Sequence, residues 1–151
     1  MVEELERTRN TETAEIVVRG VSRLMHHLGE TCLSEFTLKT GRRVDLIALD
    51  RKGAFTVVEV KSSVADFRSD NKWHEYLEFC DRFYFAVPVD FPTAILPTEC
   101  GLMVADGYGS EILRESQPGS MNPTRRKALT LRFARTAATR LMRLNDPPIG
   151  D

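Results

Sequence analysis

The chain has 151 residues, of which 42% are hydrophobic and 28% are charged, and its formal net charge is −1. This length suits one compact domain over residues 1–151, and the composition excludes a disordered or fibrous chain. No apolar run approaches the roughly 20 residues of a membrane span, and the acidic start Met1-Val2-Glu3-Glu4 is unlike a signal peptide, so we expect a cytoplasmic protein with no membrane partner.

The first predicted element is an amphipathic helix from Thr13 to Leu28, ended by Gly29. Its apolar residues recur at helical spacing and are Ala14, Val17, Val18, Val21, Leu24, Met25 and Leu28. Glu15 lies beside this stripe in the first turn, where a carboxylate interacts favourably with the helix dipole. The spacing alone therefore gives Glu15 an ordinary role at a helix start.

Two apolar runs, 44–50 and 54–63, lie on either side of a short polar loop that ends in Gly53, and this pattern predicts a β-hairpin. With a three-residue loop in which Gly53 takes the left-handed conformation, Asp45 on the first strand lies opposite Glu59 on the second. Directly opposed carboxylates repel one another and destabilise a sheet unless a positive charge neutralises them. The hairpin therefore predicts a place that needs a cation.

Lys61 joins this pair, because side chains alternate along a strand and Lys61 shares a face with Glu59. Carboxylates with open positions around them suit Mg²⁺ or Mn²⁺, which keep waters that can attack a phosphodiester. A nearby ammonium can orient such a water or offset the charge that builds on the phosphate. The alternative is a surface ion pair, but the apolar character of both strands argues against it.

The segment from Val64 to Cys80 is predicted to form a helix or a pair of helical turns, interrupted near residues 69–71. Short strands are predicted over residues 83–87, 101–105 and 110–114, and a polar link over residues 116–122 leads to the last element.

That last element is an amphipathic helix from Pro123 to about Leu144, with a frayed tail over residues 146–151. Residues 1–115 carry 14 basic and 20 acidic side chains, whereas residues 116–145 carry 7 basic and no acidic ones. One face of the helix has Phe133, Ala137, Leu141 and Leu144, and the other has Arg132, Arg135, Arg140 and Arg143. An arginine stripe of this kind suits the phosphate backbone of a nucleic acid, and the alternative is a solubilising outer face.

Asp45 is followed, fourteen positions later, by Glu59-x-Lys61, and this pattern resembles the motif of the PD-(D/E)XK nuclease superfamily. The hairpin is also similar to that of archaeal Holliday-junction resolvases. Over nearly the whole chain, including the segment from Lys72-Trp73 to Val87, the sequence resembles the MmcB-type bacterial DNA-repair proteins. It departs from the superfamily motif at Val44, which stands in place of a proline that is not a metal ligand.

The resemblance implies an α/β fold with a restriction endonuclease-like αβββαβ core, in which a mixed central sheet is flanked by helices and the basic helix follows at the C-terminus. It also implies a metal site formed by Asp45, Glu59 and the Val60 carbonyl, with Mg²⁺ or Mn²⁺ as the cofactor. Lys61 would then be the residue that handles the water. Many members carry a further Glu on the first helix, for which Glu15 is the candidate.

In this family the helical segment after the hairpin flanks the active site, which implies that Lys72 contacts phosphate and that Trp73 stacks on an unpaired base. For Trp73 the alternative is burial against the sheet. We therefore expect a metal-dependent DNA phosphodiester hydrolase that acts in DNA repair. The alternative is a non-cleaving nucleic-acid-binding or adaptor protein of a repair complex that retains the fold. The expected partners are DNA and other DNA-repair proteins, and a homodimer is left open.

Overall fold

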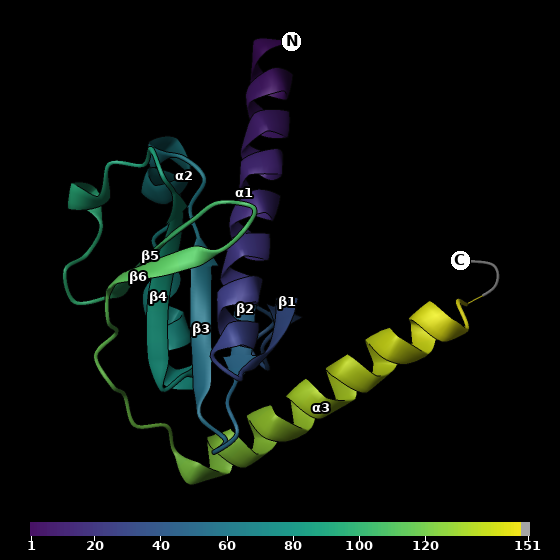
Figure 1. The fold of residues 1–151 in the computed structure, drawn as a ribbon. Coiled ribbons are helices and arrows are strands. Elements are labelled where there is room, and N and C mark those ends of the chain that lie inside the picture. Colours follow the sequence, from purple (N-terminus) through teal and green to yellow (C-terminus); the bar gives the residue numbers. More distant parts are fainter. Residues whose placement is uncertain (149–151) are drawn as a thin grey trace.

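A computed structural model describes residues 1–148 of the chain (Figure 1). Residues 149–151, part of the predicted tail, lie outside the described residues, and residues 146–148 are exposed. In chain order, the elements are α1 (Val2–His27), β1 (Thr31–Thr37), β2 (Arg43–Leu49), β3 (Phe55–Val60), α2 (Val64–Ser69), the 3₁₀ helix η1 (Trp73–Phe79), β4 (Arg82–Pro88), the 3₁₀ turn η2 (Thr93–Ile95), β5 (Gly101–Ala105), β6 (Ser110–Arg114) and α3 (Pro123–Asn145).

In the described part of the chain, the strands form a six-stranded sheet in the order β1-β2-β3-β4-β5-β6. The pairs β1–β2, β2–β3 and β5–β6 are antiparallel, whereas β3–β4 and β4–β5 are parallel. The crossover from β3 to β4 runs through α2 and η1, as a parallel connection requires. The expected α/β class, the mixed sheet and the αβββαβ order are therefore confirmed.

Helices cover both faces of this sheet. α1 packs on one face, where the buried residues are Val17, Val21, Met25, Leu46, Ala48, Val58, Val60, Tyr84, Ala86, Met103 and Ala105. η1 and the first half of α3 pack on the other face, which is rich in aromatic residues, including Phe36, Phe55, Trp73, Tyr76, Phe79, Phe83, Phe85 and Phe133. Because both faces are buried, a charged side chain on a central strand needs a partner or a function.

The predicted hairpin is confirmed in its register. Leu46 pairs with Val58 and Leu49 pairs with Phe55. The same register, continued by one residue, places Asp45 opposite Glu59. Gly53 ends the loop with a φ of 89°, the left-handed conformation that favours glycine.

The first helix begins at Val2, eleven residues before the predicted start at Thr13. Residues 2–12 are mostly exposed and polar, so they carry no apolar periodicity, but their Glu and Arg residues favour helix. Figure 1 shows this first part of α1 extending past the ends of the strands.

The predicted last helix, from Pro123 to about Leu144, is confirmed, but only the first part of its apolar face packs against the sheet. Phe133 is buried, with its ring centroid 6.1 Å from that of Phe36 and 5.9 Å from that of Phe55. Leu141 and Leu144 are 60% and 79% exposed, because the second half of α3 extends away from the sheet (Figure 1). None of the helices in residues 1–148 has both the length and the apolar character needed to cross a membrane.

Candidate functional site

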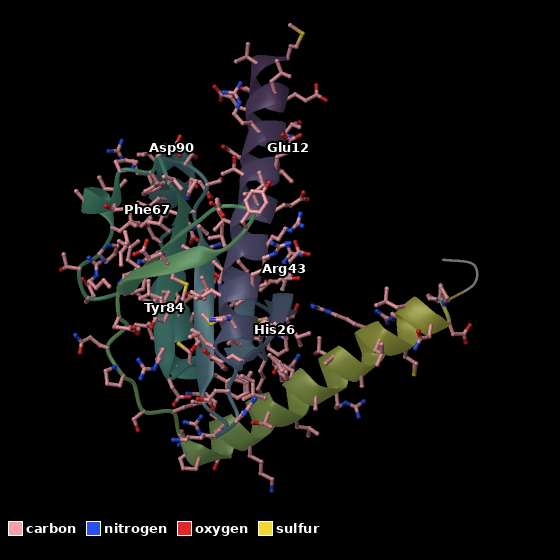
Figure 2. All side chains as sticks on the ribbon, in the orientation of Figure 1. Glu12, His26, Arg43, Phe67, Tyr84 and Asp90 are labelled. Atoms are coloured by element: carbon pink, nitrogen blue, oxygen red, sulfur yellow. The ribbon has the colours of Figure 1, made fainter. Side chains whose placement is uncertain are left out.

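The three motif residues meet at one end of the central strands. Asp45 lies near the start of β2, Glu59 near the end of β3, and Lys61 directly after β3. They line a groove of about 1540 Å³ that also has walls from α1, α2 and the β1–β2 turn. Arg43, labelled in Figure 2, lies at the start of β2 and lines the same groove.

Each carboxylate accepts a hydrogen bond from the backbone of the other strand. The NH of Asp45 donates to Oε1 of Glu59 at 3.0 Å, and the NH of Val60 donates to Oδ2 of Asp45 at 2.8 Å. The pairing of β1 with β2 skips the position of Glu35, which has a φ of +46°. The Asp45 NH is therefore available to Glu59, and the strain at a non-glycine residue lies directly beside the carboxylate pair.

Burial dominates the electrostatics of the pair. It raises the pKa of Glu59 to about 9, and the charge of Asp45 acts in the same direction. Burial also raises the pKa of Asp45, against the hydrogen bond from Val60 and the charge of Lys61. At neutral pH the pair therefore holds a proton.

One oxygen of each carboxylate remains available to a ligand. Oδ1 of Asp45 and Oε2 of Glu59 take no part in the backbone hydrogen bonds of the pair. In residues 1–148, no fully buried side-chain oxygen lacks a partner, so these two atoms reach the groove.

Hard carboxylate oxygens on a buried pair with excess negative charge fit a divalent cation such as Mg²⁺, which binds through one or two carboxylates and keeps several waters. No three His, Cys, Asp or Glu side chains gather as a metal-binding group anywhere in residues 1–148. The donors on the protein are therefore the two carboxylates and, as the resemblance implies, the Val60 carbonyl.

Lys61 is 3% exposed and points to a partner that the sequence did not reveal. Its Nζ lies 2.6 Å from Oδ2 of Asp70, which follows α2. Burial acts to raise the pKa of Asp70, but the hydrogen bonds from Lys61 and from the NH of Lys72 outweigh it and hold this pKa below its usual range. The Lys61 ammonium is thus neutralised by Asp70, while Asp45 and Glu59 share their own proton.

A further acid, Asp66, fixes the chain immediately after Lys61. Its carboxylate accepts from the NH of Ser62 at 2.9 Å, and its own NH donates to Oγ of Ser63, the N-cap of α2. The negative charge of Asp66 also raises the pKa of Asp45. Nothing in the sequence indicates that Asp66 reaches toward the site.

Comparisons with known proteins agree with this arrangement. A family model described as "DNA repair protein MmcB-like" matches residues 2–148. The chain belongs to the MmcB-like family. Its structure is similar to that of a solved protein of unknown function from Silicibacter pomeroyi, with a TM-score of 0.88 and 43% sequence identity over 92% of this chain and 95% of that one. No curated protein matches the chain.

Membership of the MmcB-like family supports a role in DNA repair and an interaction with DNA. Of the other predicted site residues in this MmcB-like chain, Glu15 and Lys72 line the groove from α1 and from the start of η1. Glu15 is exposed and does not join Asp45 and Glu59 in a three-carboxylate group within residues 1–148, so its catalytic role stays a prediction.

Trp73 is 7% exposed, and its ring centroid lies 5.8 Å from that of Phe83 and 5.7 Å from that of Phe85. Burial against the sheet, the alternative weighed for Trp73, is what the structure shows, and stacking on a base would require the ring to leave the core. Tyr76 is buried beside it and lines the groove. Burial, with the charge of Glu59 acting in the same direction, raises the pKa of Tyr76 to about 12.

Proposed function

We propose that this MmcB-like protein is a metal-dependent hydrolase of DNA phosphodiester bonds that acts in DNA repair. The observation that carries the proposal is the pair of half-buried Asp45 and buried Glu59, which line a large groove with Lys61 beside them. Burying two adjacent carboxylates costs free energy, and this cost is recovered when the pair binds a cation. A site of this type is rarely retained for stability alone.

Asp45, Glu59 and the Val60 carbonyl would hold Mg²⁺ or Mn²⁺. The metal would supply an activated water and charge stabilisation at the scissile phosphate. The NH groups of Asp45 and Val60 hold the Glu59 and Asp45 carboxylates, respectively, so both are in place before a ligand arrives.

Lys61 would orient the attacking water or stabilise the charge that develops on the phosphate. To do so, its ammonium must leave Asp70, and Lys61 already lines the groove. The basic residues Arg19, Arg42, Arg43 and Lys72 line the groove around the acids and would contact the DNA backbone.

The test is cleavage of labelled duplex, single-stranded, flap and four-way-junction DNA in Mg²⁺ or Mn²⁺, by the intact protein and by Lys61→Ala. We expect cleavage of at least one substrate by the intact protein and none by the variant, with DNA binding retained. Lys127→Ala, on the exposed surface of α3, is the matched control and should cleave normally. Cleavage that Lys61→Ala leaves unchanged would rule out this site.

The second candidate function is a DNA-binding or adaptor protein that does not cleave. The ion pair between Lys61 and Asp70 favours it, because an ammonium bound to a carboxylate is not directed at a water. Binding to the DNA panel with no cleavage of any member, in either metal, would establish this second function over the first.

A further inference from the structure

A second groove, of about 1330 Å³, runs beside α3 on the other side of the β1–β2 turn. α3 forms one wall, and the opposite wall is formed by Lys39 and Thr40 of the turn and by Glu78 and Phe79 of η1. Thr40 lines this groove and also the groove that holds Asp45 and Glu59. The two grooves therefore meet at the β1–β2 turn.

The α3 groove is strongly basic. The residues that line it include one lysine and five arginines, namely Lys39, Arg125, Arg132, Arg135, Arg140 and Arg143. Glu78 is the single acid among its lining residues in the described part of the chain, and its Oε2 lies 3.5 Å from Arg125. After this pair is discounted, the groove retains an excess of positive charge.

Packing within the protein accounts for some of these arginines and not for others. Arg140 donates to the carbonyls of Ser34 and Glu35 at 2.7 and 2.8 Å, so it holds α3 against the edge strand β1. Arg135 and Arg143 are exposed, and neither makes an ion pair or hydrogen bond within residues 1–148. A purely structural role leaves these two residues unexplained.

The chemistry of the groove suits a phosphate backbone better than free bases. Binding to single strands relies on exposed aromatic rings on which bases stack. The aromatic residue of this groove, Phe79, is 7% exposed, and the guanidinium of Arg125 lies 5.0 Å above its ring. Beside exposed apolar residues such as Leu131, the described lining offers cations and threonine hydroxyls, which bind phosphate oxygens irrespective of sequence.

We propose that the α3 groove binds the phosphate backbone of duplex DNA whose scissile strand lies in the Asp45–Glu59 groove. This inference rests on the proposed function. It specifies that the substrate is double-stranded on the side of the cleavage point that faces α3. From Arg132 to Arg143, α3 rises about 16 Å, which corresponds to several phosphates along one strand. The duplex would cross between the grooves at Thr40.

The test measures Kd for duplex DNA as a function of salt concentration in EDTA, where binding is separated from metal-dependent cleavage. The double variant Arg135→Gln/Arg143→Gln is compared with Lys52→Gln/Lys127→Gln, which removes the same charge from exposed positions outside both grooves. Each phosphate contact contributes about 0.9 to the slope of log K against log salt. We expect the arginine variant to lower that slope by about 1.8 and the lysine variant to leave it unchanged.

A second comparison uses a duplex long enough to span both grooves and one that fills only the catalytic groove. The arginine variant should weaken binding of the long duplex and leave the short one unchanged. Equal slopes for both double variants, or a larger loss for single-stranded DNA than for duplex, would overturn the inference. Failure of the proposed function gives a different result, since the protein would then bind without cleaving in Mg²⁺ while the slopes still differ.

Discussion

The ammonium of Lys61 lies 2.6 Å from the carboxylate of Asp70, a residue that belongs to no sequence motif of the site. The side chain of Lys61 is 4% exposed and that of Asp70 is 25% exposed, so the pair is largely shielded from solvent. Asp70 follows directly after α2 and also accepts from the NH of Lys72. The ion pair therefore connects the end of β3 to the segment between α2 and η1.

Asp70→Asn should destabilise the protein, because it leaves a buried ammonium without its counter-charge. Removing one partner of a fully buried pair costs 3–5 kcal/mol, and the partial exposure of Asp70 reduces our expectation to about 2 kcal/mol. Urea unfolding in EDTA measures this cost. Asp90→Asn, at an exposed position, is the control and should change stability by less than about 0.5 kcal/mol. An unchanged midpoint for Asp70→Asn would mean that the pair contributes nothing.

The hairpin could be predicted because its register is a local property. A three-residue loop ending in Gly53 fixes which residues face each other, and alternation then puts Glu59 and Lys61 on one face. Asp70 could not be predicted as a partner, because its contact with Lys61 depends on how the chain folds back after α2. The sequence does show an interruption of the helical pattern near residues 69–71, and this interruption marks where the chain turns back between α2 and η1.

Two features of the helices could not be predicted, and their physical causes differ. The start of α1 was missed because residues 2–12 form a solvent-exposed helix, in which intrinsic propensity and not an apolar stripe favours the helix. The last turns of α3 are helical as predicted, but their exposure could not be predicted, because periodicity shows which face is apolar and not where the neighbouring sheet ends. Leu144 continues the apolar face correctly but lies beyond the sheet that it would pack against.

Stability of the metal-free protein should fall as pH rises from about 5 to about 9. The folded state keeps Glu59 protonated up to about pH 9, whereas the unfolded chain releases this proton near the ordinary value of 4.5. A raised pKa contributes stability that is complete below 4.5 and is lost as pH rises toward 9, with a slope of at most about 1.4 kcal/mol per pH unit for one proton.

Asp45, whose pKa is also raised, acts in the same direction, whereas the lowered pKa of Asp70 acts only in acid. Glu59→Gln removes the titrating group, so its unfolding free energy should vary less steeply with pH than that of the intact protein. Urea titrations at several pH values in EDTA measure both slopes. Glu12→Gln, on the exposed part of α1, should keep the full slope. Parallel pH profiles for the intact protein and Glu59→Gln would show that Glu59 is not the source of the pH dependence of stability.

Mg²⁺ or Mn²⁺ should raise the Tm of the intact protein, and the increase should be larger at pH 8 than at pH 6. A cation at Asp45 and Glu59 must displace the proton that the pair holds, so binding weakens as pH falls. At a metal concentration 100 times Kd, the stabilisation is about 2.7 kcal/mol. Asp45→Asn should abolish the effect and Asp90→Asn should retain it. A metal-induced shift that survives in Asp45→Asn would place the binding elsewhere.

Phe133→Ala and Leu144→Ala should separate the anchored half of α3 from its projecting half. Phe133 packs between Phe36 and Phe55, so truncation leaves a cavity in the aromatic core and costs about 3–5 kcal/mol. Leu144 is 79% exposed, so Leu144→Ala should cost less than about 0.5 kcal/mol. Urea unfolding of both variants tests this difference at protein concentrations tenfold apart. A large loss for Leu144→Ala that shrinks on dilution would show that a second copy of the chain covers this end of α3, since only an association depends on concentration.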